Sequence, residues 1–237
     1  MFTLFFVSPE ILKEREISLT GPQAHHALSV LRVHNGEMIR LADGIGNWID
    51  GEITELSKNS LTVQVRERGA DPAARTQITI AQAILKGENQ KAALDQLVQA
   101  GVDAILPWQA HRSVAAIDKS QKWHEVMIAA ARQSRRAQIP TLLPKSDLEV
   151  LIATSSEYDY AIALHESGTT LLSEHSEIAT AHRILVIVGP EGGLSEQEIA
   201  ELEKASIPTV KLGDAVLRAD LAGAVALGAI RILTREW

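Results

Sequence analysis

From residue 77 onward, short apolar segments alternate with segments of helical periodicity. Each apolar segment has the length of one buried strand. These segments are ITIAQAIL (78–85), DAILPW (103–108), YAIALH (160–165), RILVIVG (183–189) and TVKLG (209–213). Between the first two, residues 88–100 place Leu94, Leu97 and Val98 on one helical face and stop at Gly101. Strands that alternate with helices form a parallel sheet covered on both faces, so the sequence predicts an α/β fold here.

The other helices of this region are predicted from periodicity and caps. Residues 120–136 have an apolar face, and a helix closes the chain. Capping boxes predict two further helix starts, one at Ser146 with Glu149 and one at Ser195 with Glu198.

The segment before residue 69 differs, because it contains short strands without intervening helices. EMIRLAD (37–43), NWIDGEITEL (47–56) and LTVQVRER (61–68) are separated by turn sequences. GADPAART (69–76) lacks apolar periodicity, which places a domain boundary there. We therefore expect a small β domain over residues 1–72 and a second domain over residues 73–237.

The composition limits the classes of protein to which the chain can belong. Its 237 residues are 46% hydrophobic, enough for a sizeable core. There is no cysteine, which excludes disulfides and thiolate sites, and the eight histidines form no H-E-x-x-H pattern, so we expect no metal. FTLFFV (2–7) is too short to span a bilayer. We expect a cytoplasmic protein that does not enter a membrane.

The segment VIVGPEGGLSEQEI (186–199) joins a predicted strand to a predicted helix through a glycine-rich turn. Such turns often hold phosphate, but Glu191 would repel an anion, and the lysine and hydroxyl of a phosphate-binding loop are absent. The loop therefore predicts a neutral or cationic ligand, with a strained turn that has no further role as the alternative.

A second unusual loop is KLGDAVLRADLAG (211–223), where Arg218 stands in an apolar stretch before the last helix. The arginine could act on a ligand, or it could pair with Asp214 or Asp220; Asp220 could also be the helix N-cap. Gly223 and Gly228 predict close packing of this helix against another element or subunit.

Arginines gather near the end of the predicted helix over residues 120–136, although the net charge is −7. Arg132, Arg135 and Arg136 stand at i, i+3 and i+4, which predicts a basic ridge suited to a phosphate backbone. A solvated helix end, where the dipole favours cations, is the alternative. Residues that could extend this ridge are Lys86, Lys91 and Arg112. His25 and His26 are candidates either for RNA contact or for packing.

Taken in order, these segments resemble the SPOUT superfamily of methyltransferases and, within it, the ribosomal RNA small subunit methyltransferase E family, which methylates N3 of a uridine in 16S rRNA. HHALSVLRVHNGEMIRLADGIGNW (25–48) resembles its PUA-type RNA-binding domain, and AARQSRRAQIP (130–140) resembles an interior motif. GPEGGLSEQEI (189–199) and LGDAVLRADLAG (212–223) resemble its two cofactor loops. The chain has LRADLA where the family commonly has L-R-T-x-T-A, and VQAG where it has T-E-L-G.

The resemblance implies a SPOUT-type parallel sheet with a C-terminal trefoil knot, preceded by a small PUA-like β-barrel domain, in a homodimer. It implies S-adenosyl-L-methionine as cofactor and 16S rRNA in the 30S subunit as partner. Its implied cofactor-binding residues are Leu164, His165, Gly189, Glu191, Gly192, Gly193, Leu212, Gly213, Leu217 and Arg218. Its implied RNA-binding residues are His25, Arg32, Lys86, Arg112, Arg132, Gln133, Arg135 and Arg136.

Arg218 and Asp220 are the predicted catalytic residues. Arg218 would donate hydrogen bonds to the uracil carbonyl where charge develops, and Asp220 would orient the arginine or accept the proton. Two alternatives stay open at this point: a SPOUT enzyme acting on another RNA base or on ribose, and a catalytically impaired ribosome-assembly factor, which the LRADLA departure favours.

Overall fold

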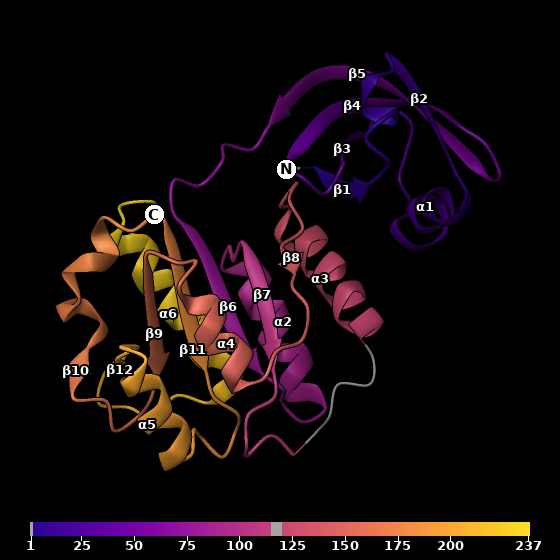
Figure 1. Ribbon diagram of the computed structural model, residues 1–237. Coiled ribbons are helices and arrows are strands. Elements are labelled where there is room, and N and C mark those ends of the chain that lie inside the picture. Colours follow the sequence, from indigo (N-terminus) through magenta and orange to yellow (C-terminus); the bar gives the residue numbers. More distant parts are fainter. Residues whose placement is uncertain (1, 115–119) are drawn as a thin grey trace. The chain divides into compact units, whose positions relative to one another are not determined.

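The computed structural model describes residues 2–114 and 120–237 and divides the chain into two units. The N-terminal unit comprises Met1–Ala73 and Ala131–Ile139, and the C-terminal unit comprises Ala74–Ala130 and Pro140–Trp237 (Figure 1). Within the described ranges, no helix is long and apolar enough to cross a membrane.

The N-terminal unit is built around a five-stranded sheet with the order β1-β3-β4-β5-β2. β1 pairs parallel with β3, and the other pairs are antiparallel. Its elements are β1 (Thr3–Phe6), η1 (Ile11–Lys13), β2 (Glu16–Thr20), α1 (Gly21–His25), η2 (His26–Leu31), β3 (Met38–Ala42), β4 (Asn47–Leu56) and β5 (Ser60–Ala70). The three predicted strands are confirmed as β3, β4 and β5, whereas the sequence analysis did not predict β1 and β2.

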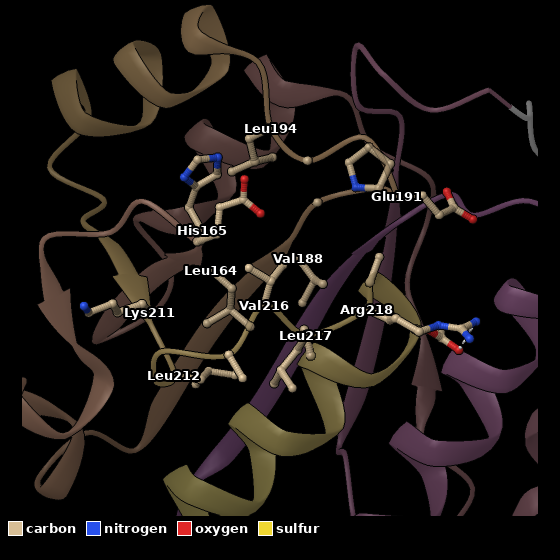
Figure 2. Close-up of a pocket in the computed structure, with 18 of the residues that line it drawn as sticks. Leu164, His165, Val188, Glu191, Leu194, Lys211, Leu212, Val216, Leu217 and Arg218 are labelled. Atoms are coloured by element: carbon tan, nitrogen blue, oxygen red, sulfur yellow. Dashed lines mark hydrogen bonds and ion pairs between the residues drawn. The ribbon is translucent and has the colours of Figure 1, made fainter.

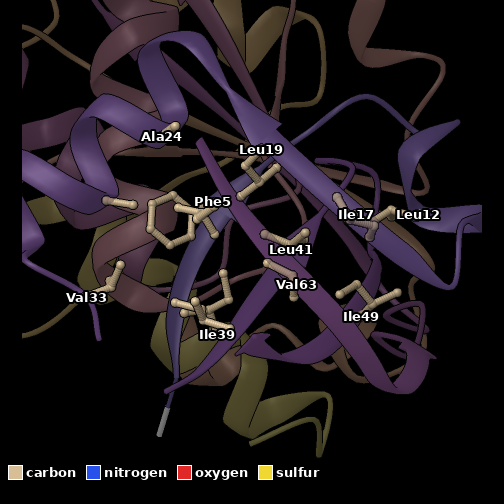
Figure 3. Close-up of a cluster of buried hydrophobic side chains, with 13 residues drawn as sticks. Phe5, Leu12, Ile17, Leu19, Ala24, Val33, Ile39, Leu41, Ile49 and Val63 are labelled. Atoms are coloured by element: carbon tan, nitrogen blue, oxygen red, sulfur yellow. The ribbon is translucent and has the colours of Figure 1, made fainter. Parts of the chain in front are cut away.

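Alternating apolar residues explain this sheet. In β2 and β3, Ile17, Leu19, Ile39 and Leu41 stand two residues apart and are buried, as a strand with one face on a core requires. Figure 3 shows them in one cluster, with Leu19 and Ile39 nearer to Phe5 and Ile17 beside Leu12.

Residues Ala131–Ile139 belong to the N-terminal unit although they follow it by more than fifty positions in the sequence. The Ile139 N–H donates to the Gly44 carbonyl at 2.8 Å, and the Ala137 N–H donates to the Asp71 carboxylate at 3.2 Å. Ala137 also packs with Leu4. Sequence periodicity did not predict this grouping, because pairing between distant segments leaves no local signal.

The helix that carries the predicted basic ridge ends earlier than expected. α3 spans Ser120–Ser134, and Arg135 adopts the left-handed conformation with φ of 60°. The Arg136 N–H donates to Ala131 O and the Arg135 N–H to Arg132 O, the bonds of a Schellman C-cap. The prediction of a helical ridge formed by Arg132, Arg135 and Arg136 is therefore wrong, because only Arg132 lies within α3.

The C-terminal unit contains a seven-stranded sheet with the order β10-β12-β9-β11-β6-β7-β8, and every adjacent pair is parallel. Its strands are β6 (Gln77–Ala83), β7 (Ala104–Trp108), β8 (Thr141–Leu142), β9 (Tyr160–Leu164), β10 (Thr170–Leu171), β11 (Arg183–Val188) and β12 (Thr209–Lys211). Its helices, besides α3, are α2 (Glu88–Gln99), α4 (Leu148–Ser155), η3 (Leu172–Glu174), η4 (Ser176–Ala179), α5 (Glu196–Lys204) and α6 (Ala219–Leu233). The predicted parallel α/β sheet is confirmed.

Helices cover this sheet on both faces. Leu151 of α4 and Leu202 of α5 pack with Ile187 and Ala81 on one face. On the opposite face, Gly223 of α6 lies so close to Leu97 of α2 that an added Cβ would come within 3.1 Å of it. The close packing predicted for Gly223 is confirmed, and the missing side chain is what allows it.

Two of the predicted helix caps can be compared with the structure. The box of Ser195 and Glu198 at the start of α5 is confirmed. The predicted box of Ser146 and Glu149 is wrong: the N-cap of α4 is Asp147, whose carboxylate accepts the Val150 N–H. Ser146 is unavailable as a cap because it is buried and pairs with Trp108 as an isolated bridge.

Candidate functional site

A cavity of about 340 Å³ opens where the carboxyl ends of β9, β11 and β12 meet (Figure 2). Such an edge is the usual ligand position in open α/β sheets, and the volume lies within the range of roughly 300–1,000 Å³ typical of ligand pockets. Three loops supply most of the lining, at residues 164–166, 188–194 and 210–220. Predicted cofactor-binding residues in this lining are Leu164, His165, Gly189, Glu191, Gly193, Leu212, Gly213, Leu217 and Arg218.

The cavity has an apolar part and a polar rim. Val188 and Leu194 of the second loop and Leu212 and Leu217 of the third project into it (Figure 2). Val188 ends β11 and Leu212 follows β12, whereas Leu194 and Leu217 lie near the starts of α5 and α6, so the strand-to-helix loops of the parallel sheet bring them together. An apolar surface of this kind suits a flat heteroaromatic ring.

The glycine-rich loop is held by bonds that the sequence analysis only partly predicted. The Ser195 and Glu198 box begins α5, and the Glu198 carboxylate also accepts the His111 N–H at 2.8 Å. Arg112 donates through Nη1 to the carbonyls of Gly192 and Leu194 at 2.9 and 3.2 Å. Gly192 faces Arg112 rather than the cavity, so its predicted cofactor contact finds no support in this geometry.

At the rim, Arg218 and Asp220 form a two-bonded ion pair. Arg218 Nε donates to Asp220 Oδ1 at 3.0 Å, and Nη2 donates to Oδ2 at 3.2 Å. The Asp220 side chain is 10% exposed, whereas the Arg218 side chain is 73% exposed. The pairing with Asp220 considered in the sequence is confirmed. The pairing with Asp214 and the N-cap role of Asp220 are wrong: Asp214 lies near Lys211, and the N-cap position of α6 is Arg218.

Asn89 and Glu191 continue this hydrogen-bond chain. Arg218 Nη2 also donates to Asn89 Oδ1 at 3.0 Å, and Asn89 Nδ2 donates to Glu191 Oε1 at 2.9 Å. The Lys86 N–H donates to the same carboxylate oxygen at 3.0 Å. Burial on its own would raise the pKa of Glu191, but these hydrogen bonds outweigh it and hold the pKa below the usual value. Glu191 is therefore ionised at neutral pH.

His165 borders the cavity in a defined orientation. Its Nδ1 accepts the Ser167 N–H at 3.2 Å and lies 2.7 Å from the Ser167 hydroxyl. With Nδ1 accepting, the neutral ring carries its proton on Nε2, which leaves a donor for a ligand.

Comparison with known proteins gives the family of this chain. A family model described as an RNA methyltransferase domain matches residues 72–231, and a second, described as an RNA methyltransferase PUA domain, matches residues 19–66. The chain is 36% identical over 227 residues to ribosomal RNA small subunit methyltransferase E of Mycobacterium bovis, covering 92% of this chain and 86% of the relative. The chain belongs to the ribosomal RNA small subunit methyltransferase E family.

Other members of this family support the assignment. The Bacillus subtilis member is 27% identical over 230 residues, covering 92% of this chain and 90% of the relative. The crystal structure of the Neisseria gonorrhoeae member, bound to S-adenosyl methionine, superposes with a TM-score of 0.88 at 28% identity and covers 98% of both chains. The predicted family is thus confirmed, together with the α/β sheet and the PUA domain.

The predicted RNA-binding residues fall in both units. His25, Arg32, Gln133 and Arg135 are exposed in the N-terminal unit, together with the half-buried Arg132 and Arg136. Burial lowers the pKa of the Arg132 guanidinium. Lys86 and Arg112 belong to the C-terminal unit, where both contact the glycine-rich loop. Their contact with RNA stays a prediction.

Asn89 is a residue of the site that the sequence analysis missed. It lies in the first turn of α2, just after the carboxyl end of β6, and it lines the cavity. Its position after a strand on the ligand-binding edge was the available signal. The described ranges contain no cluster of three His, Asp or Glu side chains able to hold a metal ion.

Proposed function

We propose that this protein transfers a methyl group from S-adenosyl-L-methionine to N3 of a specific uridine in the 16S rRNA of the small ribosomal subunit. The observation that carries the proposal is the Arg218 and Asp220 pair at the rim of a strand-end cavity, in a chain of the methyltransferase E family. Membership of the family establishes that the chain is an rRNA methyltransferase. That it methylates a uridine, and does so at N3, is our proposal.

The cavity fits S-adenosylmethionine by its chemistry. When bound, this cofactor supplies an activated methyl group on a cationic sulfonium. The apolar lining would hold the adenine, and the exposed backbone of Gly189 and Gly193 lies beside it. Glu191, which stays ionised, suits a cation and would repel a phosphate.

Arg218 and Asp220 would supply the catalytic groups. Methylation at N3 requires the N3 proton to leave, in this proposal to solvent water, and negative charge then develops on the uracil carbonyl oxygens. The exposed guanidinium of Arg218 can donate to such an oxygen. Both Asp220 oxygens already accept from Arg218, which supports the orienting role for Asp220.

The test is transfer of labelled methyl from S-adenosylmethionine to unmodified 30S subunits, with the product nucleoside identified by mass spectrometry. We expect N3-methyluridine at one 16S position. A methylated ribose or another base would identify a different substrate for the same fold. Cofactor binding without transfer would favour a ribosome-assembly factor.

We further propose that the N-terminal unit, which includes the predicted domain of residues 1–72 and also residues 131–139, binds RNA, and that the rest of residues 73–237 carries out the transfer. The PUA family match supports the first role, and the cavity supports the second. Arg32 and Arg135 are both exposed and both end a helix in the left-handed conformation, with φ of 54° and 60°. Glycine occupies that conformation at lower cost, so the arginines at these positions suit a contact with phosphate.

Replacing Arg135 by glycine should stabilise the protein while weakening RNA binding. Relief of the left-handed arginine is expected to add up to about 1 kcal/mol to the free energy of unfolding. Loss of one phosphate contact should reduce the slope of log affinity against log salt concentration by about one.

The control for this change is Ser206→Gly. Ser206 is exposed, has φ of 62° and follows α5 with the same pair of C-cap bonds. Urea unfolding should show a similar gain for both variants, whereas filter binding to 16S fragments should change only for Arg135→Gly. Unchanged RNA affinity and salt dependence in Arg135→Gly would contradict the assigned contact.

The remaining family features are proposed on the same basis. One such feature is the C-terminal trefoil knot. The loops at residues 188–194 and 210–220, which line one cavity, are the segments that would form it. A cytoplasmic location follows from a ribosomal substrate.

A homodimer is also proposed, and α6 supports it. Leu221, Val225 and Ile232 lie on one helical face and are 39%, 40% and 63% exposed. We expect light scattering to give about twice the chain mass of 25.7 kDa, and Val225→Asp to shift the protein toward monomer because a charge would be buried at the interface. Val150→Asp on α4, a residue with 51% exposure, should leave the mass unchanged. A wild-type monomer would contradict the dimer.

A further inference from the structure

We propose that Asn89 is a positioning residue that holds the Arg218 guanidinium in its reactive orientation by linking it to Glu191 of the glycine-rich loop. The proposal rests on the proposed function, because it assigns Asn89 a role in the same methyl transfer. Neither the sequence motifs nor the family match pointed to this residue.

The amide of Asn89 fits its two neighbours in one orientation. Its oxygen accepts from Arg218 Nη2 at 3.0 Å, and its nitrogen donates to Glu191 Oε1 at 2.9 Å. The opposite flip would point a donor at a cation and an acceptor at a carboxylate. Asn89 therefore links a positive and a negative side chain that form no direct bond with each other among the described residues.

Arg218 needs such a link because its side chain is 73% exposed. An exposed ion pair contributes little by itself and leaves a long side chain with considerable rotamer entropy. With Nε and Nη2 committed to Asp220 and Asn89, Nη1 donates to no acceptor in the described part of the chain. That nitrogen is left to donate to the substrate.

The backbone under Asn89 is itself anchored. The Asn89 N–H donates to Lys86 O at 3.2 Å, and the carbonyl oxygen of the buried Gln90 side chain accepts the Leu85 N–H at 2.8 Å. These bonds tie the first turn of α2 to the end of β6. Glu191 is bound from the same turn, through the Lys86 N–H. The loop that would hold the cofactor and the arginine that would act on the base are thus both attached to this turn.

The test separates turnover from binding and folding. In methyl transfer to unmodified 30S subunits, Asn89→Ala should lower kcat by about tenfold. The KM for 30S and the calorimetric Kd for S-adenosylmethionine should stay within twofold of wild type, because Asn89 lies at the polar rim and the apolar lining and the glycine-rich loop backbone are kept. The Tm should stay within about 2 °C. Gln99→Ala, which removes an exposed amide near the other end of α2, should change none of these values.

A double variant that exchanges the amide of Asn89 and the carboxylate of Glu191 tests whether restoring the link restores kcat. Asn89→Asp should lower kcat more than Asn89→Ala, since it places a carboxylate against Glu191. Adding Glu191→Gln restores a donor to that carboxylate, and at saturating S-adenosylmethionine the double variant should regain kcat to within about threefold of Glu191→Gln alone. The single variant Glu191→Gln completes the double-mutant cycle.

The possible results are distinguishable. Full kcat in Asn89→Ala, an equal loss of S-adenosylmethionine affinity, or no rescue in the double variant would overturn the positioning role while leaving the proposed function intact. Absence of turnover by the wild-type protein on its 30S substrate would instead contradict the proposed function, and the role of Asn89 with it.

Discussion

Arg218→Lys is expected to lower methyl transfer by roughly 100-fold or more while the protein stays folded, which is the loss typical of removing one donor that stabilises developing negative charge. Arginine spans Asp220 with Nε and Nη2 and still has Nη1 for the substrate. A lysine has a single nitrogen and cannot pair with Asp220 and reach a uracil oxygen in the same planar geometry. Single-turnover transfer to unmodified 30S subunits measures this loss directly.

The control for Arg218→Lys is Arg183→Lys. Arg183 is also exposed and also pairs with a carboxylate, that of Glu157 at 3.9 Å. It begins β11, so it lies at the amino ends of the strands, opposite the carboxyl ends where the cavity opens. We expect normal transfer from this variant. Calorimetry should show S-adenosylmethionine bound to Arg218→Lys with an affinity within a few-fold of wild type. Full turnover by Arg218→Lys would rule out the catalytic role of the arginine.

The sequence predicted which loops line the cavity because those loops are built from local features. A strand followed by a glycine-rich turn and a capping box has a recognisable pattern in Val188, Gly189, Ser195 and Glu198. Parallel strands then place their carboxyl ends at one edge, so the loops can be grouped before the strand order is known. The cavity lining agrees with that grouping.

Features that depend on distant pairing were not predictable in this way. β11 lies between β9 and β6, and no periodicity within 183–188 encodes that order. The grouping of Ala131–Ile139 with the N-terminal unit depends on bonds to Gly44 and Asp71, far away in the sequence. The end of α3 at Ser134 was missed because an arginine occupies the left-handed position where glycine is the usual signal.

The largest stability effect is expected from Arg231, near the end of α6. Its guanidinium is buried and donates to Asp103 Oδ2 at 2.7 Å, to Thr76 O at 2.7 Å and to the Glu236 carboxylate. It thereby joins the start of β6, the turn after α2 and the C-terminal tail. Arg231→Met removes the cation, which leaves the buried Asp103 carboxylate without a counter-charge and Glu236 with only the exposed Arg75, so urea unfolding at pH 7 should show a loss of about 3–5 kcal/mol.

Arg75→Met is the matched control. Arg75 also approaches Glu236, at 3.6 Å, but its side chain is 54% exposed, so its loss should cost within about 1 kcal/mol. Equal effects of the two substitutions would contradict the role of burial in this network.

The loss in Arg231→Met should also depend on pH. In the wild type, burial on its own would raise the pKa of Glu236, but bonds from Thr76 and Arg231 hold it below the usual 4.5. The ionised carboxylate therefore stabilises the wild type above pH 4.5, and this stabilisation disappears as pH falls through the lowered folded-state pKa. Without Arg231 the part of that stabilisation that comes from the arginine is lost, so the difference between variant and wild type should shrink in acid. A difference independent of pH would show that the ion pairs are not its source.

Arg231 and the pair of Arg218 and Asp220 lie near opposite ends of α6. α6 has 15 residues, which corresponds to a length of about 22 Å. Contacts at that distance without shared partners usually act independently. We therefore expect Arg231→Met, assayed at a temperature where it is still folded, to retain wild-type kcat, whereas Arg218→Lys retains wild-type stability and loses kcat. If kcat fell in Arg231→Met in proportion to stability, the anchoring of α6 would belong to the catalytic machinery.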